Sequence, residues 1–478
     1  MTPSLLIRGA EFDDGRIADL RVTGNRIAEI GSHLNTMAGE LQIEARGAAL
    51  ARGLNDHHIH LFATAAARRS VMCGPPAVHN EEALRKALLS AMRRTDGPIR
   101  GTGFHQSVCE HLDRAWLDQV CPNRPVRIQH RSGMLWILNS TALEQLDFST
   151  SDDVPEGVER ATNGRWTGRF FNLDKWLRQR SAQSWPSLKQ LSLELARQGI
   201  TGVTDAGASN GLAEWRALAR AMTNGELLQR VQVMGSEQLS ECAPDIHGRL
   251  TRGPLKVYLR EAALPDYDML VDRIRTSHAN HRPIASHCVT RTELAFLLAA
   301  LTEAGSIPGD RVEHASITDE HALEVIARLG VTVVTQPHFI TERGSQYLTD
   351  VATDELPMLY RGAGFLHQGI PLAAGSDAPY GAISPWRSME AAITRNTACN
   401  TTISPRECLQ GRQALALFGG TLEQPGATLT SPGVGECADL CLLDRPWVKV
   451  ERAPGAVGVA LTVCNGKITH RESVGSPV

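Results

Sequence analysis

The chain has 478 residues, of which 42% are hydrophobic and 21% charged, and its formal net charge is -3. This length exceeds what one hydrophobic core usually supports, so we expect a large domain with appended or inserted modules. The small net charge gives no electrostatic reason to expect nucleic acid or an anionic membrane as a partner. The N-terminus lacks a signal-peptide pattern and no segment is apolar enough to span a bilayer, so we expect a cytoplasmic protein.

The two ends of the chain predict one small β-module. Short alternating segments separated by Gly, Asp and Asn fill residues 1–52, which is typical of a small sheet. Matching segments lie within residues 430–478, where Asn465-Gly466 is a hairpin signal. We therefore expect residues 1–52 and 430–478 to pair into one discontinuous β-sandwich.

Between the ends, eight strand-like apolar runs alternate with helical stretches, which predicts an α/β fold, a (β/α)8 TIM-like barrel. Most of these runs are spaced by about 30 residues, the length of a βα unit. The first run ends at His60 and the second begins at Ile200, so an insertion is expected after barrel strand 1. The barrel is predicted at 53–70 and 186–429, and the insertion domain at 71–185. The runs are 54–60, 200–205, 230–235, 255–259, 284–289, 311–315, 331–336 and 370–377.

Five of the eight tryptophans fall in the predicted insertion. They would form the core of a structural domain, or the insertion lies near the barrel mouth and some of the rings touch substrate. The sequence leaves both interpretations open.

Polar residues near the ends of these runs suggest one metal site. His58 and His60 are two positions apart, so on an extended strand both imidazoles point to the same side. Four further runs each carry one such residue toward their C-terminal end, where the active site of a parallel barrel lies. These residues are Lys256, His287, His314 and Asp377. Nitrogen and carboxylate ligands suit zinc first, with cobalt or manganese as alternatives.

Three motifs contain most of these residues: G-L-N-D-H-H-I-H-L at 53–61, R-V-E-H-A at 311–315 and G-S-D-A-P at 375–379. With these motifs the chain resembles the metal-dependent amidohydrolase superfamily, in its amidohydrolase family 3 branch. It implies that Lys256 carries a CO2-derived carbamate that bridges two metal ions, so that one or two ions are expected per subunit. It also implies an amidohydrolase that acts on carbon–nitrogen bonds other than peptide bonds.

The expected reaction is hydrolysis of a C–N bond in a small, neutral amide, carbamate or thiocarbamate by metal-activated water. Asp377 is the expected catalytic residue, because its carboxylate can take a proton from water and give it to the leaving nitrogen. Candidate substrate-binding residues are His130 and Trp136 in the insertion, and His338 and Arg343 after the seventh strand.

Two other functions are alternatives. A mononuclear heterocycle deaminase uses a similar ligand set, but it typically has a glutamate three residues after the strand 5 histidine, where this chain has Thr290. A non-catalytic scaffold disagrees with the intact set of six ligands. The expected partners are a small-molecule substrate and further copies of the chain, as a dimer or tetramer.

Overall fold

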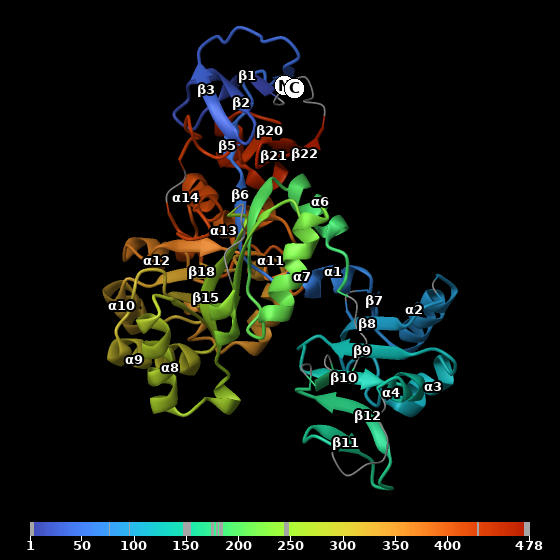
Figure 1. Ribbon diagram of the computed structural model, residues 1–478. Helices are drawn as coiled ribbons and strands as arrows, with labels where there is room; N and C mark the ends of the chain where they lie inside the picture. The colour runs from blue at the N-terminus through green and yellow to red at the C-terminus, as the bar shows by residue number, and fades with distance from the viewer. Residues whose placement is uncertain are drawn as a thin grey trace. The chain divides into compact units, whose positions relative to one another are not determined.

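A nearly closed barrel of eight parallel strands forms the centre of the protein (Figure 1). The computed structural model describes residues 4–75, 77–94, 96–146, 154–173, 176–177, 180, 185–242, 248–427 and 430–472. The strand order is β19-β18-β17-β16-β15-β14-β13-β6, and each adjacent pair is parallel. The strands are β6 (Leu54–Ile59), β13 (Ile200–Asp205), β14 (Arg230–Gly235), β15 (Leu250–Tyr258), β16 (Ile284–Cys288), β17 (Arg311–His314), β18 (Thr332–Thr335) and β19 (Leu372–Ala374). The predicted barrel is therefore confirmed.

The two ends of this sheet meet at the C-terminal end of β19. Asp377 N–H donates to the carbonyl of His58 at 2.7 Å, and His60 N–H donates to the carbonyl of Ala378 at 2.9 Å. These two bonds link the segment after β19 to β6, and they fall at the residues that the sequence predicts as metal ligands.

Helices connect the barrel strands and pack outside them (Figure 1). Their side chains toward the sheet are apolar, as in α8, where Leu270, Val271 and Ile274 are buried. Side chains cap the N-terminal ends of several helices: Asp266 caps α8, Thr290 caps α9 and Asp319 caps α10. The helices are α6 (Lys189–Arg197), α7 (Leu212–Thr223), α8 (Tyr267–Ala279), α9 (Arg291–Ala304), α10 (Glu320–Leu329), α11 (His338–Asp350), α12 (Ala363–His367), α13 (Pro385–Thr394) and α14 (Gly411–Ala416).

Two four-stranded sheets from the chain ends share one core. The first has the order β3-β2-β1-β4 and the second β22-β21-β20-β5. Leu20 and Ile7 of the first sheet belong to the same buried cluster as Leu442 and Leu461 of the second. The elements are β1 (Ser4–Glu11), β2 (Ile17–Thr23), β3 (Arg26–Gly31), β4 (Leu41–Glu44), β5 (Leu50–Arg52), β20 (Leu440–Leu443), α15 (Trp447–Arg452), β21 (Val459–Cys464) and β22 (Lys467–Arg471). The predicted pairing of the two chain ends is confirmed.

The chain divides into two compact units, Met1–Leu61 with Ser187–Val478, and Phe62–Pro186. The insertion predicted at 71–185 falls within the second unit, and its place near the barrel mouth stays a prediction. The second unit has a six-stranded sheet, ordered β11-β12-β10-β9-β8-β7. Its elements are β7 (Val71–Met72), α2 (Glu81–Arg94), β8 (Ile99–Phe104), α3 (Arg114–Val120), β9 (Val126–His130), β10 (Leu135–Leu138), α4 (Ser140–Glu144), β11 (Val158–Arg160) and β12 (Trp166–Phe171), and α1 (Leu61–Arg68) spans the junction.

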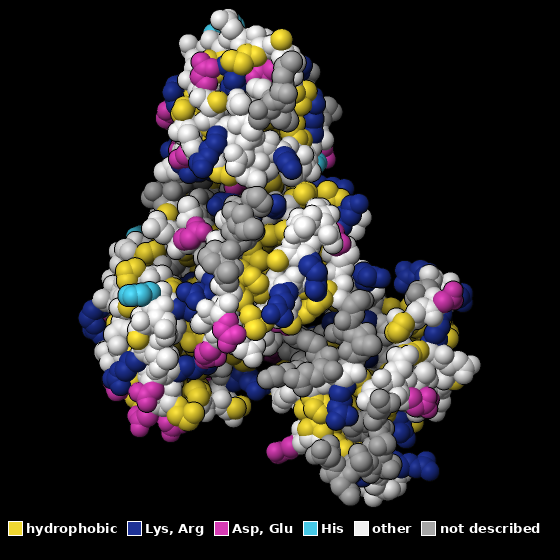
Figure 2. All heavy atoms as spheres, viewed as in Figure 1, with side chains coloured by type: hydrophobic (Ala, Val, Ile, Leu, Met, Phe, Trp, Pro, Cys, Tyr) yellow, Lys and Arg dark blue, Asp and Glu magenta, His cyan; other side chains and the backbone are white. Residues whose placement is uncertain are grey.

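The distribution of charged side chains on the surface is consistent with the small net charge of the chain. Figure 2 shows basic and acidic side chains interspersed on the face in view, with apolar atoms between them. Among the described helices, none has the length and hydropathy that a bilayer span requires.

Candidate metal centre

His58 and His60 approach one carboxylate oxygen. His58 Nε2 lies 3.4 Å and His60 Nε2 lies 3.3 Å from Asp377 Oδ1. Both imidazoles therefore point to the same side of the chain, as their spacing predicts. His57, between Asp56 and His58, is fully buried, and this burial lowers the pKa of its imidazole to about 3.

Two residues of the centre lie in strained backbone. The φ angles of His314 and Asp377 are 71° and 49°, in the left-handed region that non-glycine residues rarely adopt. Such a conformation costs about 1–3 kcal/mol per residue and clusters at functional sites. One ligand atom each from His58, His314 and Asp377 lies within 4.8 Å of the others, a spacing that can hold one metal ion.

His287 and Lys256 come from neighbouring strands next to this group. The His287 ring centroid lies 4.5 Å from that of His314. Lys256 is buried, its Nζ lies 3.9 Å from Glu313 Oε2, and the described residues offer that Nζ no hydrogen-bond partner. Burial lowers the pKa of Lys256 to about 8, against the opposing attraction of Glu313. A fully buried amine without a hydrogen bond calls for a further group beside it.

Glu313 and Gln336 orient two of the histidines. His58 Nδ1 hydrogen-bonds Glu313 Oε2, and His314 Nδ1 lies 2.7 Å from Gln336 Oε1. When Nδ1–H donates to an acceptor, Nε2 keeps its lone pair free, and this is the tautomer that can bind a metal ion through Nε2. Arg311, two positions before Glu313 on β17, donates to the same carboxylate.

Sequence reasoning did not identify Arg311 and Glu313 as residues that support the centre. Arg311 and Glu313 carry charges at alternate positions of a run that otherwise reads as a buried strand. That pattern was a usable signal, because buried charges are expected only where they are paired.

The protonation states of the centre suit a divalent cation. Burial lowers the pKa of His58 to about 3, and burial also lowers the pKa of His314. Burial would raise the pKa of Asp377, but its hydrogen bond to His60 and the adjacent imidazoles hold that pKa below its usual range. Metal ligands must be neutral imidazoles and ionised carboxylates. The donor set, together with the buried Lys256 whose Nζ makes no hydrogen bond to the described residues, therefore fits a metal ion.

His338 and Arg343 lie in the barrel unit with different surroundings. His338 is buried, and its ring nitrogens contact the carbonyl of Ser376 at 3.1 Å and the hydroxyl of Ser388 at 3.2 Å. Arg343 stacks on Phe339, with 3.8 Å from its guanidinium carbon to the ring centroid. His338 thus holds the segment that carries Asp377, and Arg343 lies nearer the surface.

His130 and Trp136 lie in the second unit. The ring of His130 hydrogen-bonds Ser132 at 2.8 Å and Gln106 at 3.1 Å. Trp136 is buried, and the guanidinium carbons of Arg100 and Arg127 lie 5.2 and 5.5 Å from its ring centroid. These contacts are internal to the unit, and a substrate role for either residue stays a prediction.

Known proteins resemble the chain over nearly its whole length. The profile of the amidohydrolase family matches residues 42–470. An N-substituted formamide deformylase of Arthrobacter pascens is 24% identical over 485 residues, which cover 89% of this chain and 89% of the relative.

Two crystal structures share the fold. An uncharacterized metal-dependent hydrolase of Pyrococcus horikoshii OT3 aligns over 98% of this chain and 100% of its own, with a TM-score of 0.76 and 18% identity. Atrazine chlorohydrolase TrzN of Arthrobacter aurescens TC1, complexed with zinc, aligns over 97% and 94%, with a TM-score of 0.56 and 15% identity. The chain belongs to the amidohydrolase family and is a metal-dependent amidohydrolase, an enzyme that acts on carbon–nitrogen bonds.

Proposed function

We propose that the protein hydrolyses the C–N bond of a small, neutral amide, carbamate or thiocarbamate at a metal centre on the C-terminal ends of the barrel strands. The observation that carries the proposal is the convergence of His58, His314 and Asp377 from three strand ends. The relative that deformylates N-substituted formamides is similar over 89% of the chain, which supports an N-substituted amide as the first substrate to test.

The proposed ligands are the six residues predicted from the sequence, namely His58, His60, Lys256, His287, His314 and Asp377. Zinc is the proposed ion, with cobalt or manganese as alternatives, because imidazole and carboxylate donors suit it and because the TrzN structure contains zinc. Bound there, the ion supplies Lewis acidity, which lowers the pKa of a water and polarises a carbonyl.

The residues of the chain perform the remaining steps. The carboxylate of Asp377 accepts the proton released by the attacking water and returns it to the leaving nitrogen. Glu313 and Gln336 keep His58 and His314 in one tautomer, so that Nε2 of each ring faces the reacting groups.

Lys256 is the proposed site of a carbamate, which would give it two oxygen donors in place of an amine. Its burial and the missing hydrogen bond at Nζ support this role. A heterocycle deaminase would typically have a glutamate at position 290. This chain has Thr290 there, and its hydroxyl caps helix α9 by accepting from Glu293 N–H at 3.2 Å, so the deaminase alternative gains no support.

The test is the metal content per subunit of protein purified without added metal, for wild type and for Lys256→Ala. The exposed Lys189→Ala on α6 is the matched control. We expect about two ions in wild type and in the control, one or fewer in Lys256→Ala, and faster loading of wild type when bicarbonate is added. One ion that is unaffected by the substitution would contradict the carbamate and support a mononuclear centre.

A further inference from the structure

A basic cavity lies within the second unit, at the ends of helices α1 and α2 and beside strands β7 and β8. Its volume is about 330 Å³, within the range of sites that hold small ligands. Four arginines line it, and none of the described residues around it is acidic. These arginines are Arg68 in the last turn of α1, Arg69 directly after it, Arg94 in the last turn of α2 and Arg100 on β8.

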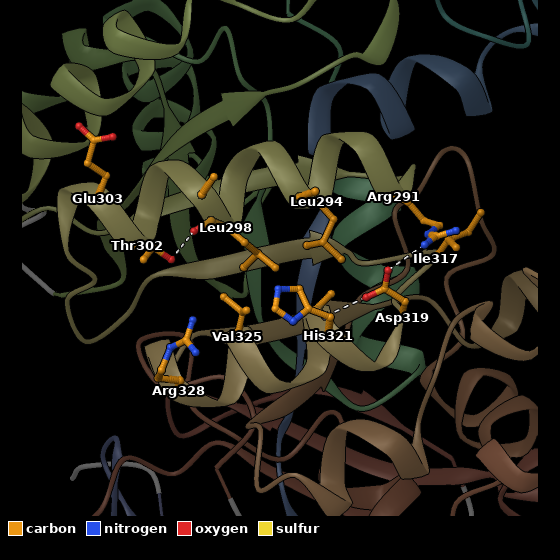
Figure 3. Close-up of a pocket in the computed structure, with 13 residues that line it drawn as sticks. Arg291, Leu294, Leu298, Thr302, Glu303, Ile317, Asp319, His321, Val325 and Arg328 are labelled. Atoms are coloured by element: carbon orange, nitrogen blue, oxygen red, sulfur yellow. Dashed lines mark hydrogen bonds and ion pairs between the residues drawn. The ribbon is translucent and has the colours of Figure 1, made fainter.

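The cavity between α9 and α10 has a different charge pattern (Figure 3). There Arg291 lies 3.0 Å from Asp319, and the lining contains acidic as well as basic side chains. Charges of opposite sign at that distance offset each other. The basic cavity of the second unit has no acidic side chain in its described lining, so an anion that enters it meets only cations.

Two of its guanidinium groups are available to a ligand. Arg69 and Arg94 are exposed, and neither side chain makes a hydrogen bond or an ion pair within the part of the chain that the structure describes. Binding an anion there breaks no existing ion pair of these two residues. The charge of both guanidinium groups therefore remains available for the interaction.

The helix ends at the cavity do not account for this charge. The C-terminus of a helix attracts cations, but it carries only about half a negative charge. The two ends of α1 and α2 together offset about one positive charge, which is less than Arg69 and Arg94 supply. A carbonyl near the end of each helix also has a partner, because Ala66 accepts from the Ser70 hydroxyl at 2.7 Å and Met92 accepts from Arg124 at 2.9 Å.

Arg100 is held in a fixed orientation in the wall of the cavity. Its Nη1 donates to the Ser70 hydroxyl at 2.7 Å, and its Nη2 donates to Gln129 Oε1 at 3.0 Å. Both acceptors are neutral, so these two contacts position the guanidinium without neutralising it. A guanidinium held in this way loses little freedom when it binds, and its planar shape suits carboxylate and phosphate groups.

Apolar side chains form the rest of the cavity wall. Ala91 and Ile99 are buried and Val71 is half-buried. Contact with such side chains removes a hydrocarbon part of a ligand from water, which stabilises the complex. The lining thus combines cationic groups for an anion with an apolar surface for a hydrocarbon part.

We propose that this cavity binds a small organic anion. Its phosphate or carboxylate group lies among the guanidinium groups of Arg69, Arg94 and Arg100, and its apolar part rests on Val71 and Ile99. None of the proposed metal ligands lines the cavity, so this binding is independent of the hydrolysis proposed above. The exposed charges also attract anions from a distance, an effect that salt weakens.

The test is titration calorimetry of the full-length protein with phenyl phosphate and with benzoate. Both probes carry an aromatic ring, and the probe that binds more tightly identifies the anionic group. We expect binding that weakens as NaCl is added. Phenol lacks the charge and inorganic phosphate lacks the apolar part, so each should bind about ten-fold more weakly than phenyl phosphate.

A double variant locates the site. Arg69→Gln with Arg94→Gln removes both available charges, and we expect it to bind the preferred probe about ten-fold more weakly or not at all. Arg93→Gln with Arg165→Gln is the control, because it removes the same charge from exposed positions of the same unit that do not line the cavity. Circular dichroism should show that both double variants are folded.

Three results would overturn the proposal. The first is that neither phenyl phosphate nor benzoate binds. The second is that both double variants bind the preferred probe equally well, which would place the anion elsewhere, for example at the metal centre. The third is that phenol binds as tightly as phenyl phosphate, because the arginines would then contribute nothing.

Discussion

The backbone N–H of Asp377 donates to the carbonyl of His58 at 2.7 Å, across the point where the eighth barrel strand meets the first. A second hydrogen bond, 2.9 Å long, joins the same two segments, from His60 N–H to the carbonyl of Ala378. Three of the proposed ligands therefore also close the barrel. A change that separates these two segments acts on the fold and on metal binding together.

Gly375→Ala tests this coupling. A Cβ at Gly375 would lie 2.5 Å from the Cβ of His58 and 2.7 Å from its Cα, so the two segments have to move apart. Overpacking of this kind costs about 1–3 kcal/mol. We expect the urea midpoint of unfolding to fall and the bound metal to decrease in the same variant. Gly433→Ala is the control, because the atoms nearest to its new Cβ belong to the flexible end of Glu436, 3.3 Å away. Equal effects of both substitutions would count against the coupling.

Asp377→Asn removes the proposed proton carrier and retains the shape of the side chain. We expect an unchanged circular dichroism spectrum and a turnover that is about 10²–10⁴-fold lower, because general acid–base catalysis contributes that much. The measurement is the rate of amine release from an N-substituted formamide or another amide that wild type hydrolyses. Exposed Asp354→Asn should be as active as wild type. Near-native turnover of Asp377→Asn would exclude this residue as the proton carrier.

Glu313→Gln weakens the acceptor that holds His58. We expect the dissociation constant for zinc, measured by competition with a chromogenic chelator, to rise about 10–100-fold. The free energy of unfolding should fall as well, because Arg311 loses its charged partner in the barrel interior. The exposed Glu324→Gln on α10 serves as control. If zinc affinity stays constant while stability drops, Glu313 supports only the fold.

The N-terminal sheet should give the protein a pH-dependent stability. Glu40, whose side chain is fully buried, accepts from Arg21 Nε at 2.8 Å and from the Ser4 hydroxyl at 2.7 Å. Burial would raise the pKa of Glu40, but these hydrogen bonds outweigh it and lower the pKa from 4.5 to about 2. The folded state therefore gains stability from the ionised carboxylate above pH 4.5, and loses it as the pH falls toward 2.

Glu40→Gln should accordingly lower the free energy of unfolding by about 1–3 kcal/mol above pH 5, with a difference from wild type that shrinks toward pH 2. Urea unfolding at a series of pH values measures this difference. Glu29→Gln is the control, because the Glu29 side chain is half exposed and its contact with Arg21 contributes at most about 1 kcal/mol. A difference that does not change with pH would show that Glu40 acts through packing alone.

The barrel could be predicted from the sequence because its strands are short, apolar and regularly spaced. The sequence predicts the eighth strand at 370–377, but β19 spans only Leu372–Ala374. The chain leaves the strand conformation before Asp377, whose φ is 49°. The fourth strand begins earlier than predicted, at Leu250, because Leu250 to Arg252 already pair with β14.

The supporting contacts of the centre were harder to predict. Gln336 reaches His314, and Glu313 reaches His58 across the barrel. Such pairs depend on which strands face each other and on where a side chain points, and a pattern within one strand does not contain that information. Hydrophobic periodicity reveals which residues are buried, whereas the partners of buried polar groups emerge only from the closed barrel.

Strand β6 is translated long before its neighbours. It hydrogen-bonds to β13, which begins at Ile200, and to the segment that contains Asp377. While a ribosome is still adding residues before position 377, His58 and His60 have been synthesised but their carboxylate partner has not. Binding of a metal ion by the proposed ligand set therefore has to follow synthesis of the last barrel strand, and it requires that the segment after this strand has paired with β6.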